Sequence, residues 1–324
     1  MALSDDYPET KEWIDFARQK IEKSISVQSD EGSNHEGLNY SVYGNLWLVR
    51  ALTLLQGFDK DIFNKSAYLK NWYKYFEAYS VSNRLDTFFD TGDSPRTLWY
   101  NPCEIFLRLY QVYGTEDYLK LYSYYLKKYD AIKPGLFTVV YGIDEQGDPG
   151  QSPTMPAPYF SDDLGLFIDR WPWTGDVNIS FLFKSGVPGG KNANALLKTL
   201  KPSHMNRSHE HPDQNHFIVW DNGEYLISDT GYTDKKLSKD HNTLLVGGLG
   251  QLGEGEQYYL GGELNADMAR YGNSSSANNY GLGASMLPGF FITKYTMIYG
   301  RAGVETQYNK VNSNKLLFGT TNQL

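Results

Sequence analysis

The sequence predicts an α+β protein with two packed domains, a helical one followed by one of antiparallel strands. Residues 9–130 carry apolar side chains at three- and four-residue steps, which is the spacing of amphipathic helices. From about residue 150 the pattern changes to short β-like runs separated by turn residues. The proline-rich stretch GDPGQSPTMPAP between them is typical of a linker, so we place the domains at 1–150 and 151–324.

The helical domain is expected to contain successive helices of similar length joined by short turns. In ETKEWIDFARQKIEKSI the apolar side chains of Trp13, Ile14, Ala17, Ile21 and Ile25 fall on one face. The helical segments that follow are YSVYGNLWLVRALTLLQG, AYLKNWYKYFEAY, PCEIFLRLYQVYG and EDYLKLYSYYLKKY. Such a succession favours stacked antiparallel helical hairpins.

The second domain is expected to be an antiparallel sheet built from the runs NISFLFKSG, HFIVW, EYLISD and NTLLVGG. Between HFIVW and EYLISD lies DNG, which is a strong hairpin signal. This hairpin would bring residues 209–215 beside residues 225–231. His211 and Asp229 then become neighbours although 18 positions separate them.

The composition excludes several classes of function. The net charge is −8 and no run of Lys or Arg exceeds two residues, so a nucleic-acid-binding protein is not expected. The single cysteine, Cys103, rules out an internal disulfide and a cysteine-based metal site. No apolar run approaches a membrane span, and MALSDDYPETKEW lacks the pattern of an export signal. The 26 tyrosines suit carbohydrate binding, since a phenol offers a flat apolar face and a hydroxyl together.

Three of the six histidines lie within SHEHPDQNHF, which makes this stretch a candidate site. His209 and His211 are two apart and would project to the same face of a strand, while Pro212 indicates an edge or irregular strand. Asp229 ends the next strand and His241 begins the following run. Two imidazoles and a carboxylate suit Zn²⁺ or Mn²⁺, with a fourth place for water or another protein group.

Two other interpretations of this stretch remain. The first is that these are solvated polar residues near turns. The second is a cupin-like metal barrel, but the Glu that cupins usually supply is replaced here by Asn215 and His216. Because His216 alternates with Phe217, we expect it to face away from the cluster.

At these residues the chain resembles the heparinase II/III-like superfamily of polysaccharide lyases, and in particular its alginate-lyase-like members. The resemblance lies in HEHPDQNHF, GEYLISDTGY and DHNTLLVGGLGQ, which occur in this order. Upstream, EGLNYSVYG is similar to the family's EG-x-x-Y-x-x-YG segment, and DTGDSP and DDLGLFIDRWPW are weaker matches. The resemblance spans roughly residues 5–255.

The resemblance implies a partial (α/α) toroid packed on an antiparallel β-sandwich, with a cleft between them. It implies β-elimination on a uronic-acid polymer, with a divalent metal held by His211, Asp229 and His241. Zn²⁺ is the first choice of ion, with Mn²⁺ or Ca²⁺ as alternatives. His209 would face the substrate and Tyr40 would be the catalytic tyrosine. The metal would fix the loops that hold His209, and direct Lewis-acid help is a second option.

The chemistry of β-elimination suits these residue types. A base removes the C5 proton of a uronate, an acid protonates the leaving O4, and charge on the uronate carboxylate is neutralised. Tyrosine can serve either proton transfer, provided that its pKa is lowered when it acts as the base. Tyr43, one turn after Tyr40, is a further substrate-binding candidate. Arg170 can meet the uronate carboxylate, pair with Asp169 or pack on Trp171.

The chain also departs from the family pattern. No Asn-Asn-His occurs, although family members carry an Asn-His motif on an upstream helix, and the strand-rich part is short after GGLGQ. We therefore expect a chain truncated at both ends, with weak or absent activity unless the missing part is supplied. The parent protein is expected to be bacterial and secreted or periplasmic.

The expected partner is an acidic polysaccharide or oligosaccharide. Alginate is favoured over a heparin-like polymer, because the motifs are nearest to those of bacterial alginate lyases and no dense Lys/Arg cluster suggests sulfate binding. The alternatives are a uronyl C5-epimerase, a heparin- or heparan-type lyase, and a non-catalytic polysaccharide-binding remnant.

Overall fold

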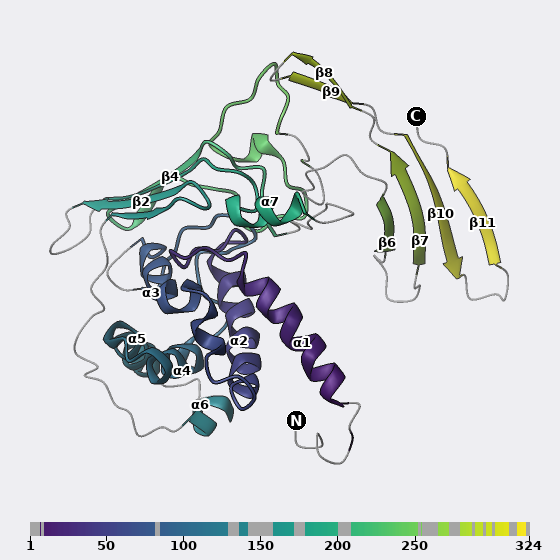
Figure 1. The fold of residues 1–324 in the computed structure, drawn as a ribbon. Helices are drawn as coiled ribbons and strands as arrows, with labels where there is room; N and C mark the ends of the chain where they lie inside the picture. Colours follow the sequence, from purple (N-terminus) through teal and green to yellow (C-terminus); the bar gives the residue numbers. More distant parts are fainter. Residues whose placement is uncertain are drawn as a thin grey trace. The chain divides into compact units, whose positions relative to one another are not determined.

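The computed structural model describes residues 10–81, 85–128, 136–141, 158–171, 179–199 and 209–251, together with Tyr7 and Glu254 and the backbone of six strands between residues 265 and 321. The chain divides into two compact units (Figure 1). The first comprises Met1–Lys198 and Asn206–Tyr259, and the second comprises Thr199–Met205 and Leu260–Leu324. The change from helices to strands falls between Tyr141 and Tyr159, inside the first unit.

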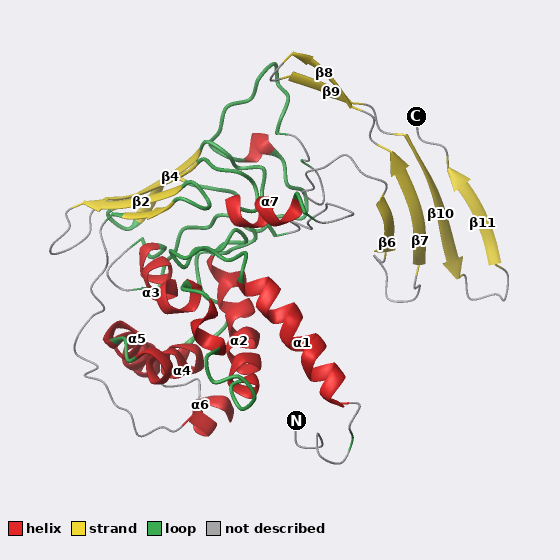
Figure 2. Cartoon of the chain, viewed as in Figure 1, coloured by secondary structure: helices red, strands yellow, loops and turns green. Residues whose placement is uncertain are grey.

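The first unit begins with the helices that the periodicity predicts (red in Figure 2). They are α1 Thr10–Ile25, α2 Leu38–Leu55, α3 Tyr68–Ala78, α4 Cys103–Tyr113, α5 Glu116–Lys128 and the short α6 Leu136–Tyr141, with the 3₁₀ turn η1 Ile62–Lys65 before α3. Gly114 ends α4 in the left-handed conformation that favours glycine. The five longer helices confirm the five predicted helical segments.

Aromatic side chains form much of the core between these helices. Trp72, Phe76, Phe106, Tyr118 and Tyr125 are fully buried, and the rings of Phe76 and Phe106 meet edge to face at 4.9 Å. The Tyr125 hydroxyl donates a hydrogen bond of 2.6 Å to a backbone carbonyl, so a buried phenol keeps its polar atom satisfied. Part of the tyrosine content therefore serves packing rather than a surface.

Five antiparallel strands follow in the order of the sequence. They are β1 Tyr159–Ser161, β2 Leu166–Trp171, β3 Ile179–Lys184, β4 His216–Asp221 and β5 Glu224–Ile227, with α7 Lys191–Leu197 between β3 and β4. Along β4 buried and half-buried residues alternate, as the period of a strand requires. Asn222 and Gly223, both with positive φ, turn β4 into β5 and confirm the hairpin predicted from DNG.

The run NTLLVGG was predicted as a strand, and this is wrong. Residues 242–250 form turns with one isolated bridge between Val246 and Leu249, and Leu244 and Val246 are more than 70% exposed (77% and 74%). Gly247 and Gly248 both have positive φ, which bends the chain before a ladder can form. The 3₁₀ turn η2 Ser238–Asp240 precedes this segment.

The second unit contains further antiparallel strands. β6 Asn265–Tyr271, β7 Asn279–Met286, β10 Ala302–Lys310 and β11 Leu316–Thr321 form one sheet, and β8 Gly289–Thr293 pairs with β9 Thr296–Tyr299. The fold is thus α+β, with α1 to α6 before the first strand and α7 between β3 and β4, while the toroid and the sandwich stay predictions. All of the predicted linker except its last residue, Pro158, lies outside the described residues. No described helix has the length and hydrophobicity needed to cross a bilayer.

Arg170 joins the sheet to a helix, which corrects its assignment as a substrate-binding residue. It lies on β2 and is only 4% exposed. Its guanidinium donates to the carbonyl of Ser80 at 3.0 Å, to that of Glu77 at 2.8 Å and to that of Ala78. Two of these carbonyls belong to the end of α3, where helical partners run out, and that of Ser80 follows just after it, so Arg170 caps the helix and has no surface left for a sugar.

We expect Arg170→Met to lower the free energy of unfolding by roughly 2–4 kcal/mol, because buried carbonyls would lose a charged donor. Urea denaturation followed by circular dichroism measures the change. The control is Trp171→Ala, at the neighbouring position, whose side chain is 64% exposed and should matter by less than about 0.5 kcal/mol. Equal effects of the two substitutions would contradict the capping role.

Candidate functional site

Asp93 is the residue around which the site is arranged. It lies in the segment between α3 and α4, and its Oδ2 is 3.0 Å from His209 Nδ1 while its Oδ1 is 2.8 Å from His211 Nε2. Its backbone N–H donates to the His209 carbonyl at 3.0 Å, and buried Lys236 approaches Oδ2 at 3.1 Å. His209 and His211 thus point to the same group, as predicted, although residues 209–215 form turns rather than a strand.

The environment keeps Asp93 ionised. Burial alone would raise the pKa of Asp93, but hydrogen bonds from His209 and His211 and the charge of Lys236 outweigh it and hold this pKa well below its usual value. An ionised carboxylate can only accept hydrogen bonds. The ring nitrogens that face it, His209 Nδ1 and His211 Nε2, are therefore its donors, which leaves His209 Nε2 and His211 Nδ1 directed away from Asp93.

The structure brings together the three residues predicted as metal ligands. His211, Asp229 and His241 are buried, and each offers a ligand atom within 4.8 Å of the other two. Asp229 Oδ2 lies 2.8 Å from His241 Nδ1, and Asp229 Oδ1 accepts the backbone N–H of Gly231 at 2.8 Å. The β4–β5 hairpin positions Asp229 just after β5, while His211 lies just before β4.

The donor set fits a divalent cation. His211 Nδ1 and His241 Nε2 are buried and have no hydrogen-bond partner among the described residues. Burial would raise the pKa of Asp229, but His216 and His241 hold it far below its usual value, so an anionic charge is present. Burial would lower the pKa of His241, yet Asp229 raises it, so a metal would have to displace a proton there.

His216 faces this cluster, which corrects the expectation that it faces away. His216 Nε2 lies 2.9 Å from Asp229 Oδ2, in a geometry outside that of a hydrogen bond, and its ring is 5.5 Å from that of His241. Its Nδ1 accepts the backbone N–H of Asn242 at 3.0 Å. The expected alternation along β4 is present, but the buried face of the strand is the one directed at the cluster.

Asp213, in the same stretch, has a different partner. It is fully buried, and its Oδ1 forms an ion pair of 2.7 Å with Lys184 of β3, whose ammonium is also 3.6 Å from Glu210 Oε1. Burial lowers the pKa of Lys184, but the two carboxylates outweigh it and raise that pKa above its usual value. The buried ion pairs of Lys184 with Asp213 and Glu210 attach the 209–213 segment to β3. The sequence did not predict them.

Tyr40 lies against His209, so the two predicted catalytic residues meet. Their rings stack with centroids 3.6 Å apart at an angle of 17°. Tyr40 lies in the first turn of α2, which follows Gly37 with a φ of 84°. A Cβ at Gly37 would lie 2.4 Å from the Thr91 carbonyl, and this close approach explains the glycine of the EG-x-x-Y segment.

The surroundings keep Tyr40 protonated. Burial, a hydrogen bond with Tyr232 and the charges of Asp93 and Glu36 all raise the pKa of the Tyr40 phenol well above its usual value. The lowered pKa that a tyrosine base requires is therefore not found. The protonated phenol is instead a proton donor near neutral pH.

Tyr43 lies near Tyr40 on the exposed surface of α2. It is 40% exposed, and its ring is 6.5 Å from that of Tyr40 and 5.2 Å from that of Tyr100. Its predicted role in substrate binding stays a prediction.

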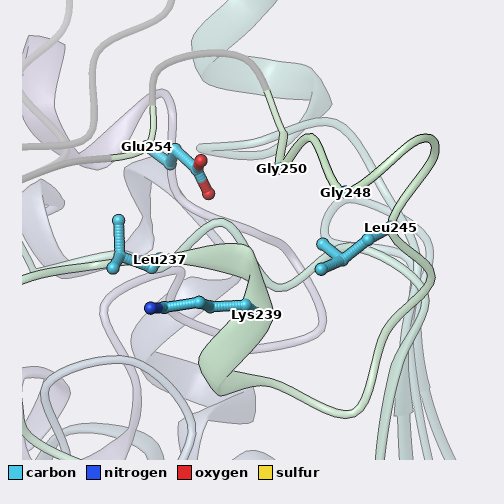
Figure 3. A pocket seen from close by; sticks show the side chains of 6 residues that line it. All are labelled: Leu237, Lys239, Leu245, Gly248, Gly250 and Glu254. Atoms are coloured by element: carbon cyan, nitrogen blue, oxygen red, sulfur yellow. The ribbon is translucent and has the colours of Figure 1, made fainter.

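The first unit also contains a pocket of about 220 Å³ (Figure 3). It is lined by Leu237, Lys239, Leu245, Gly248, Gly250 and Glu254. Glu254 also accepts the backbone N–H of Ser238 at 2.8 Å, so its carboxylate holds the loop. None of the lining residues is a candidate catalytic or metal-binding residue, and the geometry around Asp93 is the stronger indication of a site.

No family model matches the sequence, and no curated protein matches it. The structure is similar to the heparan sulfate lyase HepC from Pedobacter heparinus, with 13% sequence identity and a TM-score of 0.47 over 94% of this chain and 41% of that one. It is also similar to a heparinase III gene product, with 15% identity and a TM-score of 0.46 over 95% of this chain and 42% of that one. The chain thus spans less than half the length of these structures.

We expect Asp93→Asn to lower the free energy of unfolding by about 3–5 kcal/mol, since it leaves the buried Lys236 charge without its carboxylate. The matched control is Asp162→Asn, because Asp162 pairs with Lys191 at 2.6 Å in an exposed salt bridge. Its loss should cost less than about 1 kcal/mol. Urea unfolding of both variants checks the difference, and similar costs would show that Asp93 does not organise the site.

Proposed function

We propose that this chain carries part of the active site of a polysaccharide lyase that cleaves a uronic-acid polymer by β-elimination. The observation that carries the proposal is the stack of Tyr40 on His209, with His209 anchored through Asp93 to the cluster of His211, Asp229 and His241. An acid and a base thus lie side by side next to a candidate cation site. β-Elimination needs these three elements, namely proton removal, proton donation and charge neutralisation.

His209 is the proposed base for the C5 proton. Its Nδ1 is engaged by Asp93, so Nε2 is the nitrogen able to accept a proton. The His209 side chain is 31% exposed, which leaves it accessible to a polymer, whereas that of His211 is fully buried. The Asp93 carboxylate also stabilises the imidazolium that forms when the proton arrives.

Tyr40 is the proposed acid for the leaving O4. Because its phenol is held protonated, it can donate to the alkoxide that develops as the C4–O4 bond breaks. The electron pair of the C5–H bond then forms the C4–C5 double bond, and the product has an unsaturated uronate end. Tyr43, on the exposed side of Tyr40, would contact the sugar next to the reacting one.

The metal in this proposal is divalent and bound by His211, Asp229 and His241, with Zn²⁺ preferred by the two imidazoles. It would supply positive charge and fix the segments that carry these residues. Asp93 would then connect the metal ligand His211 with the base His209, and carboxylates in this position orient metal-bound histidines.

Alginate is the proposed polymer. Two cations near the site are already paired, Lys236 with Asp93 at 3.1 Å and Arg96 with Asp90 at 2.8 Å. Sulfate groups would call for further cations, whereas an unsulfated uronate needs its single carboxylate neutralised. The proposed parent protein is bacterial and secreted or periplasmic, where such polymers are encountered.

We expect Tyr40→Phe to reduce the formation of unsaturated uronate ends by about 10²–10⁴-fold, because a phenyl ring keeps the stack but lacks the acid. The assay is ultraviolet absorbance on a panel of alginate, unsulfated heparosan, heparan sulfate, chondroitin and glucuronan. Tyr43→Phe is the matched control and should stay within about tenfold of the parent chain, since only one exposed hydroxyl is removed.

The same assay separates the alternatives. A C5-epimerase would change the uronate configuration, seen by NMR, without unsaturated ends. Binding of oligouronate with no turnover, unaffected by Tyr40→Phe, would favour a non-catalytic binding protein. If Tyr43→Phe rather than Tyr40→Phe abolishes elimination, the assignment of the acid is wrong.

We expect His211→Ala and His241→Ala to abolish stoichiometric Zn²⁺ binding, measured by elemental analysis after equilibrium dialysis. The control His209→Ala removes a nearby imidazole outside the three ligands and should retain the metal. A chelator should lower the melting temperature of the loaded chain, because a ligand at 100 times its Kd contributes about 2.7 kcal/mol. Retention of Zn²⁺ by both ligand variants would exclude this site.

A further inference from the structure

Four exposed aromatic rings extend from the Tyr40–His209 pair, and we call them the aromatic wall. They are Trp99 (49% exposed), Tyr232 (48%), Tyr43 (40%) and Tyr100 (40%). Trp99 meets Tyr40 edge to face at 5.9 Å and meets Tyr232 at 5.6 Å. The Tyr43 ring is 5.2 Å from that of Tyr100 and 6.5 Å from that of Tyr40. The wall is therefore continuous with the proposed acid.

Buried polar contacts hold the Trp99 side of the wall in place. Asn39, which is 1% exposed, donates to the carbonyls of Pro95 and Thr97 at 3.1 Å each and accepts the backbone N–H of Trp99 at 2.9 Å. Its own N–H donates to Ser94 Oγ at 3.0 Å. Because Asn39 adjoins Tyr40 in α2, the same helical turn fixes both the acid and the loop that presents Trp99.

Tyr232 is held in place by the segment that follows β5. It follows Gly231, whose φ is 66° and whose N–H donates to the buried Asp229 carboxylate at 2.8 Å. Tyr232 also interacts with the Tyr40 hydroxyl. Rings held in this way lose little conformational freedom when a ligand covers them, so the exposed apolar area is available for binding.

The polar atoms of the wall also indicate its ligand. Large adjoining aromatic faces in contact with water mark interaction sites. The wall offers flat faces edged by phenol hydroxyls, and two cations close to it in the chain, Arg96 and Lys236, pair with Asp90 and Asp93. Arg96 also lies 4.0 Å from the centre of the Tyr225 ring. Such a surface matches the C–H face and the hydroxyls of a pyranose rather than sulfate groups.

We propose that the aromatic wall is a subsite for an unsulfated pyranose that flanks the reacting uronate, with Trp99 as its main stacking residue. This inference rests on the proposed lyase function for the identity of the polymer. Beyond Tyr43, which was already a substrate-binding candidate, it adds Trp99, Tyr100 and Tyr232 as a specificity-determining surface. Sugars that carry sulfate on the stacked ring would lose both the flat contact and their counter-charges.

The test is isothermal titration calorimetry with hexasaccharides of alginate, unsulfated heparosan and heparin, on the chain carrying Tyr40→Phe so that no ligand is consumed. Trp99→Ala should weaken binding of an unsulfated hexasaccharide by about 5- to 10-fold, and Trp99→Phe should restore part of it. The matched control Trp171→Ala, on β2 and 64% exposed, should leave the affinity within about twofold. Circular dichroism verifies that each variant is folded.

Three results would overturn the proposal. They are equal loss in the Trp99 and Trp171 variants, tighter binding of the heparin hexasaccharide that does not depend on Trp99, and no binding of any hexasaccharide. Trp99-dependent binding with no elimination, even when the rest of the proposed active site is supplied, would refute the lyase function alone, and elimination with Trp99-independent binding would refute the wall alone.

Discussion

The Asp93 carboxylate is the constraint on which the rest of the site depends, because one buried anion serves His209, His211 and Lys236 together. Burying a carboxylate is unfavourable unless every lone pair finds a donor, and here the donors come from segments more than 100 positions away. The arrangement fixes both imidazole tautomers, so a single residue sets which nitrogen of each histidine is basic. A proposed base and a proposed metal ligand are thereby coupled.

Polar contacts of the same kind join the helices to the sheet of the first unit. Arg170 caps α3 from β2, Ser180 Oγ donates to the Val81 carbonyl at 2.9 Å, and the Tyr225 hydroxyl donates to that of Phe88 at 2.6 Å. Each contact ties a strand to the region between α3 and α4, where Asp93 and Trp99 also lie. Because several hydrogen bonds hold the strands against this region, the rings of Tyr40 and His209 keep a defined geometry, which the proposed proton transfers require.

Much of the fold followed from local patterns. Helical periodicity predicted α1 to α5, and DNG predicted the β4–β5 hairpin and with it the approach of His211 to Asp229. The strand expected at NTLLVGG failed because two glycines with positive φ override the apolar run. Arg170 was misassigned for another reason. An arginine before an exposed tryptophan gives no sign that its guanidinium will be buried against the end of a helix about 90 positions earlier.

By itself the sequence determined the helices, the hairpin and a set of candidate imidazole and carboxylate ligands, since these depend on residue spacing within about 30 positions. Only the tertiary structure decided how these groups act. It brought Asp93 from DTGDSP into contact with two distant histidines and directed His216 toward the cluster. It also raised the pKa of the Tyr40 phenol, which keeps it protonated, and placed the Trp99 ring beside that of Tyr232. Ionisation and ring stacking depend on what surrounds a side chain, and here those surroundings come from segments that are remote in the chain.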